Sequence, residues 1–459
     1  EDILAQGTCG AEADGSNVTW VLTTDGTMIL SGTGAVAGYG YDKAPWYDYR
    51  EQILGLEVQK GITSVSGFCD CGNLREVSLP EGLISIDKYA FDRCVQIQEI
   101  RLPKTLKTLG DYALASCEGL TEIELPEGLE TIGTAALGYN NFTSLVIPAS
   151  VTEMGYNACR KNQQLEEVEI KANVPLLNLT FGDCSKLRRV VISGSVQKLS
   201  NTFQACCALE EVLVTGSLET IDGDSFRYLN SLERVQIASG LKTINEKAFI
   251  RCGSLTTVSL PDGVTSIGES AFQDCGSLTT INLPDSITTI GMYAFYGTKL
   301  TGPLNIPRSL VSLGESAFSG CGGITGTLVF PETLEYISTD AFIDCVGLEE
   351  VVLPKGVVSI GDYAFKNCAG IRRLWFTNSV KSVGANAFVG LSSLEVLYFS
   401  GTASDWNTGI AWGWAQDRET LNSKCKLTEQ VDSGSCGEAL TWSLNSAGDL
   451  TISGTGDMA

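Results

Sequence analysis

The sequence predicts a β-rich α/β solenoid, an arc of about fifteen short units that share one continuous core. Three observations lead to this prediction. Residues 248–261 read AFIRCGSLTTVSLP and residues 271–284 read AFQDCGSLTTINLP, so one phrase returns after 23 residues. Each phrase carries an apolar anchor in the same place, Phe249 or Phe272. Each also ends in alternating apolar residues closed by Pro, which is typical of a short strand with one buried face.

Residues 1–55 do not carry this phrase, and we interpret them as a small N-terminal β module that caps the solenoid. Apolar and polar residues alternate around Asp25-Gly26, a strong hairpin signal, with Trp20 and Leu30 among the apolar positions. The first unit of a solenoid exposes a strand edge that invites aggregation. A terminal module that covers this edge is therefore expected.

The solenoid itself is expected over residues 56–399. Within a unit, a parallel strand on the concave face ends at Pro, and a short second strand precedes a glycine such as Gly268. Residues 269–274 are expected to form one helical or 3₁₀ turn that places Phe272 in the core. Fifteen residues occupy the anchor position: Phe68, Phe91, Leu114, Leu137, Cys159, Phe181, Phe203, Phe226, Phe249, Phe272, Phe295, Phe318, Phe342, Phe365 and Phe388.

Ten of the sixteen cysteines lie three residues after an anchor, and we interpret them as a buried structural ladder of thiols. They are Cys71, Cys94, Cys117, Cys184, Cys206, Cys252, Cys275, Cys321, Cys345 and Cys368. Asn140 and Asn162 replace Cys at this position in two units, so a side chain that hydrogen-bonds a backbone group is favoured there. Parallel side chains in such a column have the wrong geometry for disulfides. Of the other cysteines, Cys425 and Cys436 are candidates for a disulfide, whereas Cys9, Cys69, Cys159 and Cys207 have no assignment.

After Phe399 the period stops, and two further segments are expected. Residues 400–430 contain three tryptophans and are predicted to form a C-terminal cap on the last unit. Residues 431–459 are predicted to be a partial second copy of the N-terminal module. Cys436-Gly437 matches Cys9-Gly10, and Trp442 matches Trp20.

Composition excludes several classes of function. The chain holds 31 Lys and Arg against 54 Asp and Glu, a net charge of −23, which argues against binding to nucleic acid or anionic membranes. No apolar run reaches the roughly 18 residues of a spanning helix, so membrane insertion is not expected. The absence of histidine excludes Ser-His-Asp and Cys-His catalysis and HExxH zinc sites. We expect no enzymatic activity, no cofactor and no metal.

The repeat resembles that of the BspA-like bacterial leucine-rich repeat family, whose unit reads approximately LxxIxLPxxVxxIGxxAFxxCxxL. The similarity extends over residues 56–399, and the segments around Trp20 and Tyr398 resemble the pieces that flank the repeats in this family. The resemblance implies a secreted or surface-attached, non-enzymatic protein of a host-associated bacterium, with its signal peptide removed. It also implies adhesion to host matrix proteins or to other bacteria. The family offers no shared binding residues that can be transferred to this sequence.

A candidate binding site follows from the outward positions of the main strands. Most of these are polar, as a solvated face requires, but Val352, Trp375 and Tyr398 follow one another in one column and Arg373 lies beside them. Exposed aromatic residues with a nearby arginine are typical of interaction hot spots. The alternative is that the C-terminal cap folds over them.

The leading hypothesis for function is a monomeric adhesin that binds host matrix proteins, bacterial surface proteins or glycans through its concave face. A scaffold that displays another domain is the alternative. A carbohydrate-active enzyme with paired carboxylates is the least favoured class, because it needs a groove that holds both groups.

Overall fold

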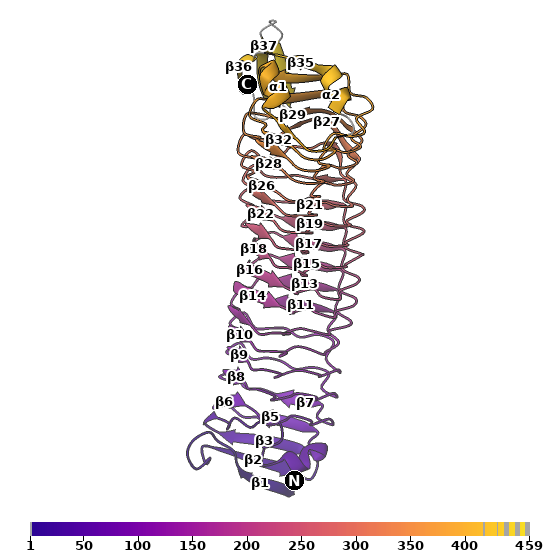
Figure 1. Cartoon of the computed structure of the whole chain (residues 1–459). Coiled ribbons are helices and arrows are strands. Elements are labelled where there is room, and N and C mark those ends of the chain that lie inside the picture. Colours follow the sequence, from indigo (N-terminus) through magenta and orange to yellow (C-terminus); the bar gives the residue numbers. More distant parts are fainter. Residues whose placement is uncertain (1, 416–417, 429, 436–439, 446–449, 455–459) are drawn as a thin grey trace. The chain divides into compact units, whose positions relative to one another are not determined.

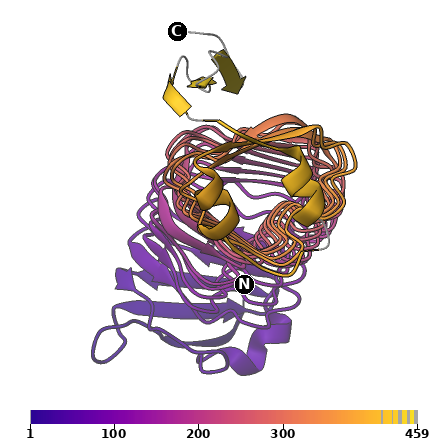
Figure 2. The same ribbon diagram turned by 45° about the horizontal axis from the view of Figure 1, so that its top comes forward.

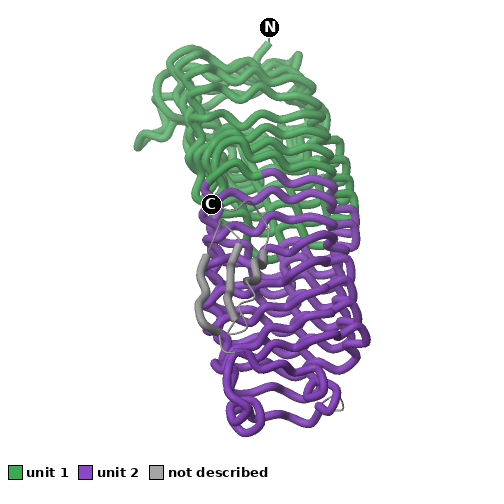
Figure 3. The backbone as a smooth tube through the Cα atoms, turned by 90° about the horizontal axis from the view of Figure 1, so that it is seen from above, with its two compact units in different colours: residues 1–232, 237–239 green, residues 233–236, 240–459 purple. Residues whose placement is uncertain are grey.

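The computed structural model describes residues 2–415, 418–428, 430–435, 440–445 and 450–454. The chain forms two compact units, one of Glu1–Leu232 with Ile237–Ser239 and the other of Glu233–Gln236 with Gly240–Ala459 (Figure 3). Both are built from successive coils whose short strands pair in parallel with those of the next coil (Figure 1). With about fifteen turns in total, the predicted parallel β-solenoid is confirmed.

Unit 1 opens with an antiparallel meander that joins the solenoid directly. Its strands are β1 (Ile3–Thr8), β2 (Val18–Thr23) and β3 (Thr27–Gly32), and β3 then pairs in parallel with β5 (Gly55–Val58), which pairs with β7 (Glu76–Ser78). The second sheet of these coils consists of β4 (Gly34–Ala35), β6 (Ile62–Val65), β8 (Ser85–Ile86), β9 (Thr108–Leu109), β10 (Thr131–Ile132) and β12 (Glu153–Met154). Later coils contribute β11 (Ser144–Ile147), β13 (Glu167–Ile170), β15 (Arg189–Ile192) and β17 (Glu211–Val214), with β14 (Val174–Asn178), β16 (Ser195–Ser200) and β18 (Ser217–Ile221) in the second sheet.

Unit 2 repeats this arrangement. Its main strands are β19 (Arg234–Ile237), β21 (Thr257–Ser259), β23 (Thr280–Ile281), β25 (Thr301–Pro303), β27 (Gly323–Val329), β29 (Leu348–Val352), β31 (Arg373–Thr377), β33 (Val396–Ser400) and β35 (Cys425–Leu427). Its second strands are β20 (Thr243–Ile244), β22 (Ser266–Ile267), β24 (Thr289–Ile290), β26 (Ser312–Leu313), β28 (Tyr336–Ile337), β30 (Ser359–Ile360), β32 (Ser382–Val383) and β34 (Ala411–Trp412).

The anchor residues form the centre of the core. In unit 2, Phe249, Phe272 and Phe295 stack in file with ring centroids 5.1 and 5.4 Å apart and planes within 5° of parallel. The file continues to Phe388, and all of its side chains are buried. A fixed period between coils places like residue on like residue, so aromatic stacking supplements simple burial.

The segment before each anchor is not helical, contrary to expectation. In residues 269–274, the amides of Ala271 and Gln273 close tight turns within the coil, whereas those of Ser270, Phe272 and Asp274 donate to the next coil at 2.8 Å. Ser270 and Asp274 adopt left-handed backbone angles, with φ of 55° and 58°. A helical turn would turn the amides along its own axis, whereas this alternation leaves every second amide free to pair between coils.

The ladder cysteines are buried free thiols, and in most coils each donates to the carbonyl of the anchor one coil earlier. The Sγ atom of Cys275 lies 3.1 Å from the oxygen of Phe249, and that of Cys94 lies 3.1 Å from the oxygen of Phe68. Asn140 donates in the same way to Leu114 at 2.9 Å. Cys and Asn therefore exchange at this position because each supplies a small hydrogen-bond donor to an inter-coil carbonyl.

The remaining cysteines lie in varied surroundings. Cys9 and Cys69 are buried free thiols, Cys159 is a buried anchor, and Cys207 is exposed. Cys425 is a free thiol of intermediate exposure. Its suggested partner, Cys436, lies outside the described residues.

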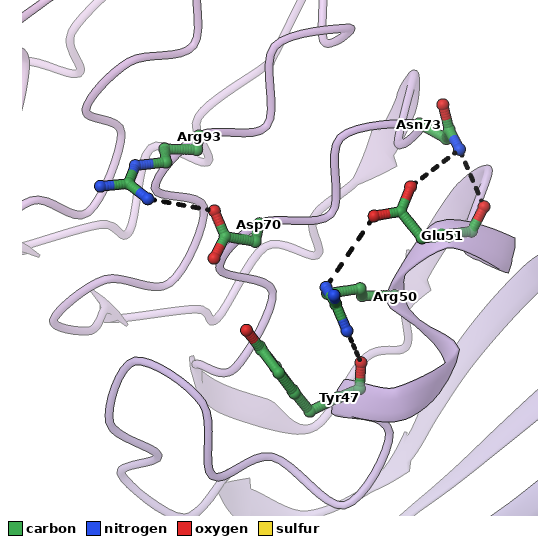
Figure 4. A network of polar contacts seen from close by, with 6 residues as sticks. All are labelled: Tyr47, Arg50, Glu51, Asp70, Asn73 and Arg93. Carbon is green, nitrogen blue, oxygen red and sulfur yellow. Dashed lines mark hydrogen bonds and ion pairs between the residues drawn. The ribbon is translucent and has the colours of Figure 1, made fainter.

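At the N-terminal end of unit 1, Trp46 begins the aromatic column. Its ring stacks on Phe68 with centroids 5.1 Å apart, and its Nε1 donates to the oxygen of Gly67 at 2.8 Å. The 3₁₀ helix η1 (Tyr47–Gln52) follows directly. Figure 4 shows that Asn73 of the first coil donates to both the backbone and the carboxylate of Glu51, which fastens η1 to that coil.

The C-terminal segment continues unit 2 by one further coil. Strand β34 pairs with β32, and β35 pairs with β33, both in parallel. Helices α1 (Ala403–Thr408) and α2 (Arg418–Lys424) lie at the end of the last coil (Figure 2). Trp406 of α1 is buried, with its ring 5.2 Å from that of Phe399. Thr402 and Asp405 form a capping box that starts α1.

After this coil, β36 (Gln430–Ser435), β37 (Leu440–Asn445) and β38 (Leu450–Gly454) form an antiparallel sheet. Its register matches that of the N-terminal meander. Trp442 pairs with Gly434 and Ile452, just as Trp20 pairs with Gly7 and Leu30, and each first strand has a bulge. This match agrees with a second copy of the module, although the domain boundaries given above stay predictions.

Candidate binding face on strands β29 to β35

The candidate site lies where the main strands of unit 2 are longest. In most earlier coils Pro follows the strand, as Pro261 does after Leu260, and this ends the hydrogen-bonded ladder. In the coils of β31 and β33 the equivalent positions are Thr377 and Ser400, which pair with each other. Loss of Pro therefore extends both strands to five residues and builds a wider sheet here.

A buried carboxylate organises this face. The side chain of Glu350 is only 7% exposed, although its position in the column was expected to point outward. Its Oε2 accepts from Thr327 Oγ1 and from the Arg373 guanidinium, both at 3.2 Å, and its Oε1 accepts from Trp375 Nε1. The neighbouring side chains thus shield the carboxylate from water and supply the hydrogen bonds that its burial demands.

The hydrogen bond to Glu350 fixes the ring of Trp375 against Tyr398. The two centroids are 4.1 Å apart with 23° between the planes, and both side chains are half-buried. Val352 is paired with Trp375 on one side, and Lys426 of β35 is paired with Tyr398 on the other. We call Val352, Trp375, Tyr398 and Lys426 the aromatic face.

The structure brings all four predicted residues together, because Arg373 flanks the aromatic face from β31. The cap does not lie on it within the described residues: β35 pairs beside β33 and extends the same sheet. Sequence reasoning missed Glu350 and Lys426 as parts of this site. The signal for Glu350 was an acidic residue one coil before Arg373, whereas Lys426 lies outside the repeat and gave no signal.

The described residues show no sign of metal or thiol chemistry. No group of three or more His, Cys, Asp or Glu side chains is placed to hold a metal ion in this part of the chain. Burial raises the pKa of Cys275 and Cys368 to about 12, which keeps these thiols protonated and unreactive at neutral pH. Among the same residues, no helix has the length and apolar character needed to cross a membrane.

Comparisons with solved structures support the fold. A leucine-rich repeat protein from Bacteroides ovatus is 22% identical, covers 90% of this chain and 98% of its own, and superposes with a TM-score of 0.52. The T. pallidum leucine-rich repeat protein is 34% identical over 38% of this chain and 82% of its own, with a TM-score of 0.34. A leucine-rich cell surface protein from Faecalibacterium prausnitzii is 19% identical, with coverage of 88% and 97% and a TM-score of 0.33. The comparison with curated proteins gives no match.

The family model for the BspA type leucine-rich repeat region matches residues 62–188, 199–325 and 324–410, with 6 copies. These ranges span most of the coils described above, including the stacked anchors and the aromatic face. The chain therefore belongs to the BspA-type leucine-rich repeat family.

Proposed function

We propose that this chain is a non-enzymatic binding protein, secreted or attached to the bacterial cell surface, that adheres to host matrix proteins, bacterial surface proteins or glycans. Repeat scaffolds of this family bind through extended faces rather than through enclosed catalytic sites. The partner would dock on the aromatic face, with Arg373 at its edge. The observation that carries the proposal is the Trp375–Tyr398 stack, held in place by Glu350.

Three features of the stack favour binding. Its rings keep part of their surface exposed on a sheet that is otherwise largely polar, and Trp, Tyr and Arg dominate interaction hot spots. The bond from Trp375 to Glu350 holds the indole before any partner arrives, so little conformational freedom is lost on binding. Arg373 and Lys426 add positive charge to an acidic chain, which would attract acidic partner surfaces.

The experiment measures binding of the full chain to immobilised host matrix proteins, bacterial surface proteins and glycans, and then compares variants on whichever partner binds. Trp375→Ala is expected to weaken binding about 30-fold or more, the effect of losing a hot-spot side chain. Trp375→Phe keeps the ring but loses the bond to Glu350, so a smaller loss is expected.

Tyr336→Ala is the matched control, because Tyr336 is an aromatic residue of unit 2 that is 46% exposed and lies on the second strands. It should bind like the wild type. Equal affinities for the wild type and Trp375→Ala would refute the aromatic face as the binding site.

A further inference from the structure

An open pocket of about 320 Å³ lies in unit 1, between the loop 38–40 and the turn that precedes the anchor Phe91. Tyr39 and Tyr89 line it with aromatic rings, Asp87 and Lys88 line it with opposite charges, and the two glycines of the loop complete it. The function proposed above uses none of these residues.

The loop is held in place by contacts at Tyr39. The Tyr39 amide donates to Ser66 Oγ at 3.0 Å, and this hydroxyl lies 3.3 Å from the carbonyl oxygen of Tyr39. The Tyr39 ring meets the buried Trp46 edge-on, with centroids 5.7 Å apart. One wall of the pocket is therefore fixed to the N-terminal cap.

Tyr41 holds the far end of the same loop. Its ring meets Tyr89 edge-on at 5.8 Å, and the Arg93 guanidinium donates to its hydroxyl. Arg93 is in turn paired with Asp70 at 3.6 Å (Figure 4). The pocket is thus formed before a ligand binds, which lowers the entropic cost of binding.

The opposite wall is a stacked pair of tyrosines. The ring of Tyr89 lies on that of Tyr112 with centroids 5.1 Å apart and 20° between the planes. Tyr89 has a left-handed backbone, with φ of 57°, and both side chains remain half-exposed. The Lys88 ammonium lies 5.2 Å from the centroid of the Tyr89 ring.

Asp87 supplies the acceptor at the pocket. Its carboxylate accepts from the Ser85 hydroxyl, and no Lys or Arg of the described chain forms an ion pair with it. Burial raises the pKa of Asp87, while the hydroxyl groups of Ser85 and Ser64 act in the opposite direction. A carboxylate in such surroundings gains from additional hydrogen-bond donors on a ligand.

These groups select a class of ligand. Aromatic rings accept a flat face of C–H groups, a carboxylate accepts hydroxyl hydrogens, and an ammonium donates to hydroxyl oxygens. The opposite charges of Asp87 and Lys88 balance, so a neutral ligand with many hydroxyl groups fits better than an ion. We propose that this pocket binds one neutral pyranose residue of a glycan, with its C–H face against a tyrosine ring and a hydroxyl donating to Asp87.

The test uses the full chain and the methyl glycosides of glucose, galactose, mannose and N-acetylglucosamine, with saturation-transfer NMR to detect contact and calorimetry to measure affinity. At least one sugar should bind with millimolar affinity. Tyr89→Ala and Asp87→Asn should each weaken it about ten-fold or more, since each removes a contact of the site. Asp87→Asn is nearly isosteric, and thermal melting checks that both variants remain folded.

Tyr363→Ala is the matched control. Tyr363 occupies the equivalent position in a coil of unit 2, with φ of 55° and the Lys366 ammonium 5.1 Å from its ring, but it does not line this pocket. It should bind the sugar like the wild type.

Three results would overturn the proposal: no saturation transfer to any of the sugars, unchanged affinity in both pocket variants, or an equal loss in Tyr363→Ala. The two proposals fail separately. Trp375→Ala should leave sugar binding at this pocket unchanged, and Tyr89→Ala should leave binding at the aromatic face unchanged.

Discussion

Phe272→Ala tests the stacked core of unit 2 directly. Phe272 is fully buried between Phe249 and Phe295, with ring centroids 5.1 and 5.4 Å away. Truncation of a buried Phe to Ala costs about 3–5 kcal/mol, and each aromatic pair contributes about 0.5–1.5 kcal/mol beyond its buried area. Because two pairs are lost, we expect a cost in the upper part of that range, about 4–5 kcal/mol.

Phe272→Leu separates stacking from volume. Leu114 and Leu137 are buried anchors of unit 1, so a coil accepts Leu at this position. The substitution keeps most of the buried volume but removes both aromatic pairs, for an expected cost of about 1–3 kcal/mol. The order of stability should therefore be wild type, then Phe272→Leu, then Phe272→Ala.

Urea unfolding followed by circular dichroism measures these differences, and Val311→Ala is the control because Val311 is 59% exposed in the same unit. A solenoid can lose cooperativity when one coil is weakened, so hydrogen exchange complements the unfolding curve. The amides of Phe249 and Phe272, which donate to the following coils at 2.8 Å, should exchange faster in Phe272→Ala. A cost below about 1 kcal/mol, or equal costs for Ala and Leu, would refute the stacked-core reasoning.

Three further predictions concern single buried groups. Cys275→Ala should cost about 1–2 kcal/mol in urea unfolding because a buried donor is lost, whereas Cys275→Asn should be nearly neutral because Asn140 fills the same role; equal costs would contradict the donor role. Burial raises the pKa of Asp92 to about 6, so the folded state holds this proton more tightly than the unfolded state and stability should fall by up to about 3 kcal/mol as pH rises from 4 to 7. Asp92→Asn should remove this component and be more stable than the wild type at pH 7, and a thermal-melting series whose pH dependence is the same in both proteins would disprove it. Trp46→Ala should cost about 3–5 kcal/mol and Trp46→Phe clearly less, since Phe keeps a ring against Phe68; intact fluorescence and melting in the Ala variant would count against Trp46 as the first member of the column.

Periodicity explains why so much of the fold was predictable. When each coil repeats the last, the neighbour of Phe272 in the core is set by the residue 23 positions away, which can be read directly. The same reasoning placed Cys275 in a buried column and Trp375 beside Tyr398. The conformation of residues 269–274 was wrong, because the competition between helical and inter-coil hydrogen bonds has no simple signal in the residue types.

The amino-acid sequence by itself determined the solenoid, its stacked anchors and the order of side chains along each column, because a fixed period converts sequence separation into spatial contact. Only the tertiary structure decided that Glu350 is buried beneath Trp375, that Lys426 joins the aromatic face and that the loop 38–40 forms a pocket with Tyr89. These features depend on side-chain direction and on how non-repeating segments meet the coils. Such contacts are set by packing and hydrogen bonding in three dimensions, for which the repeat supplies no register.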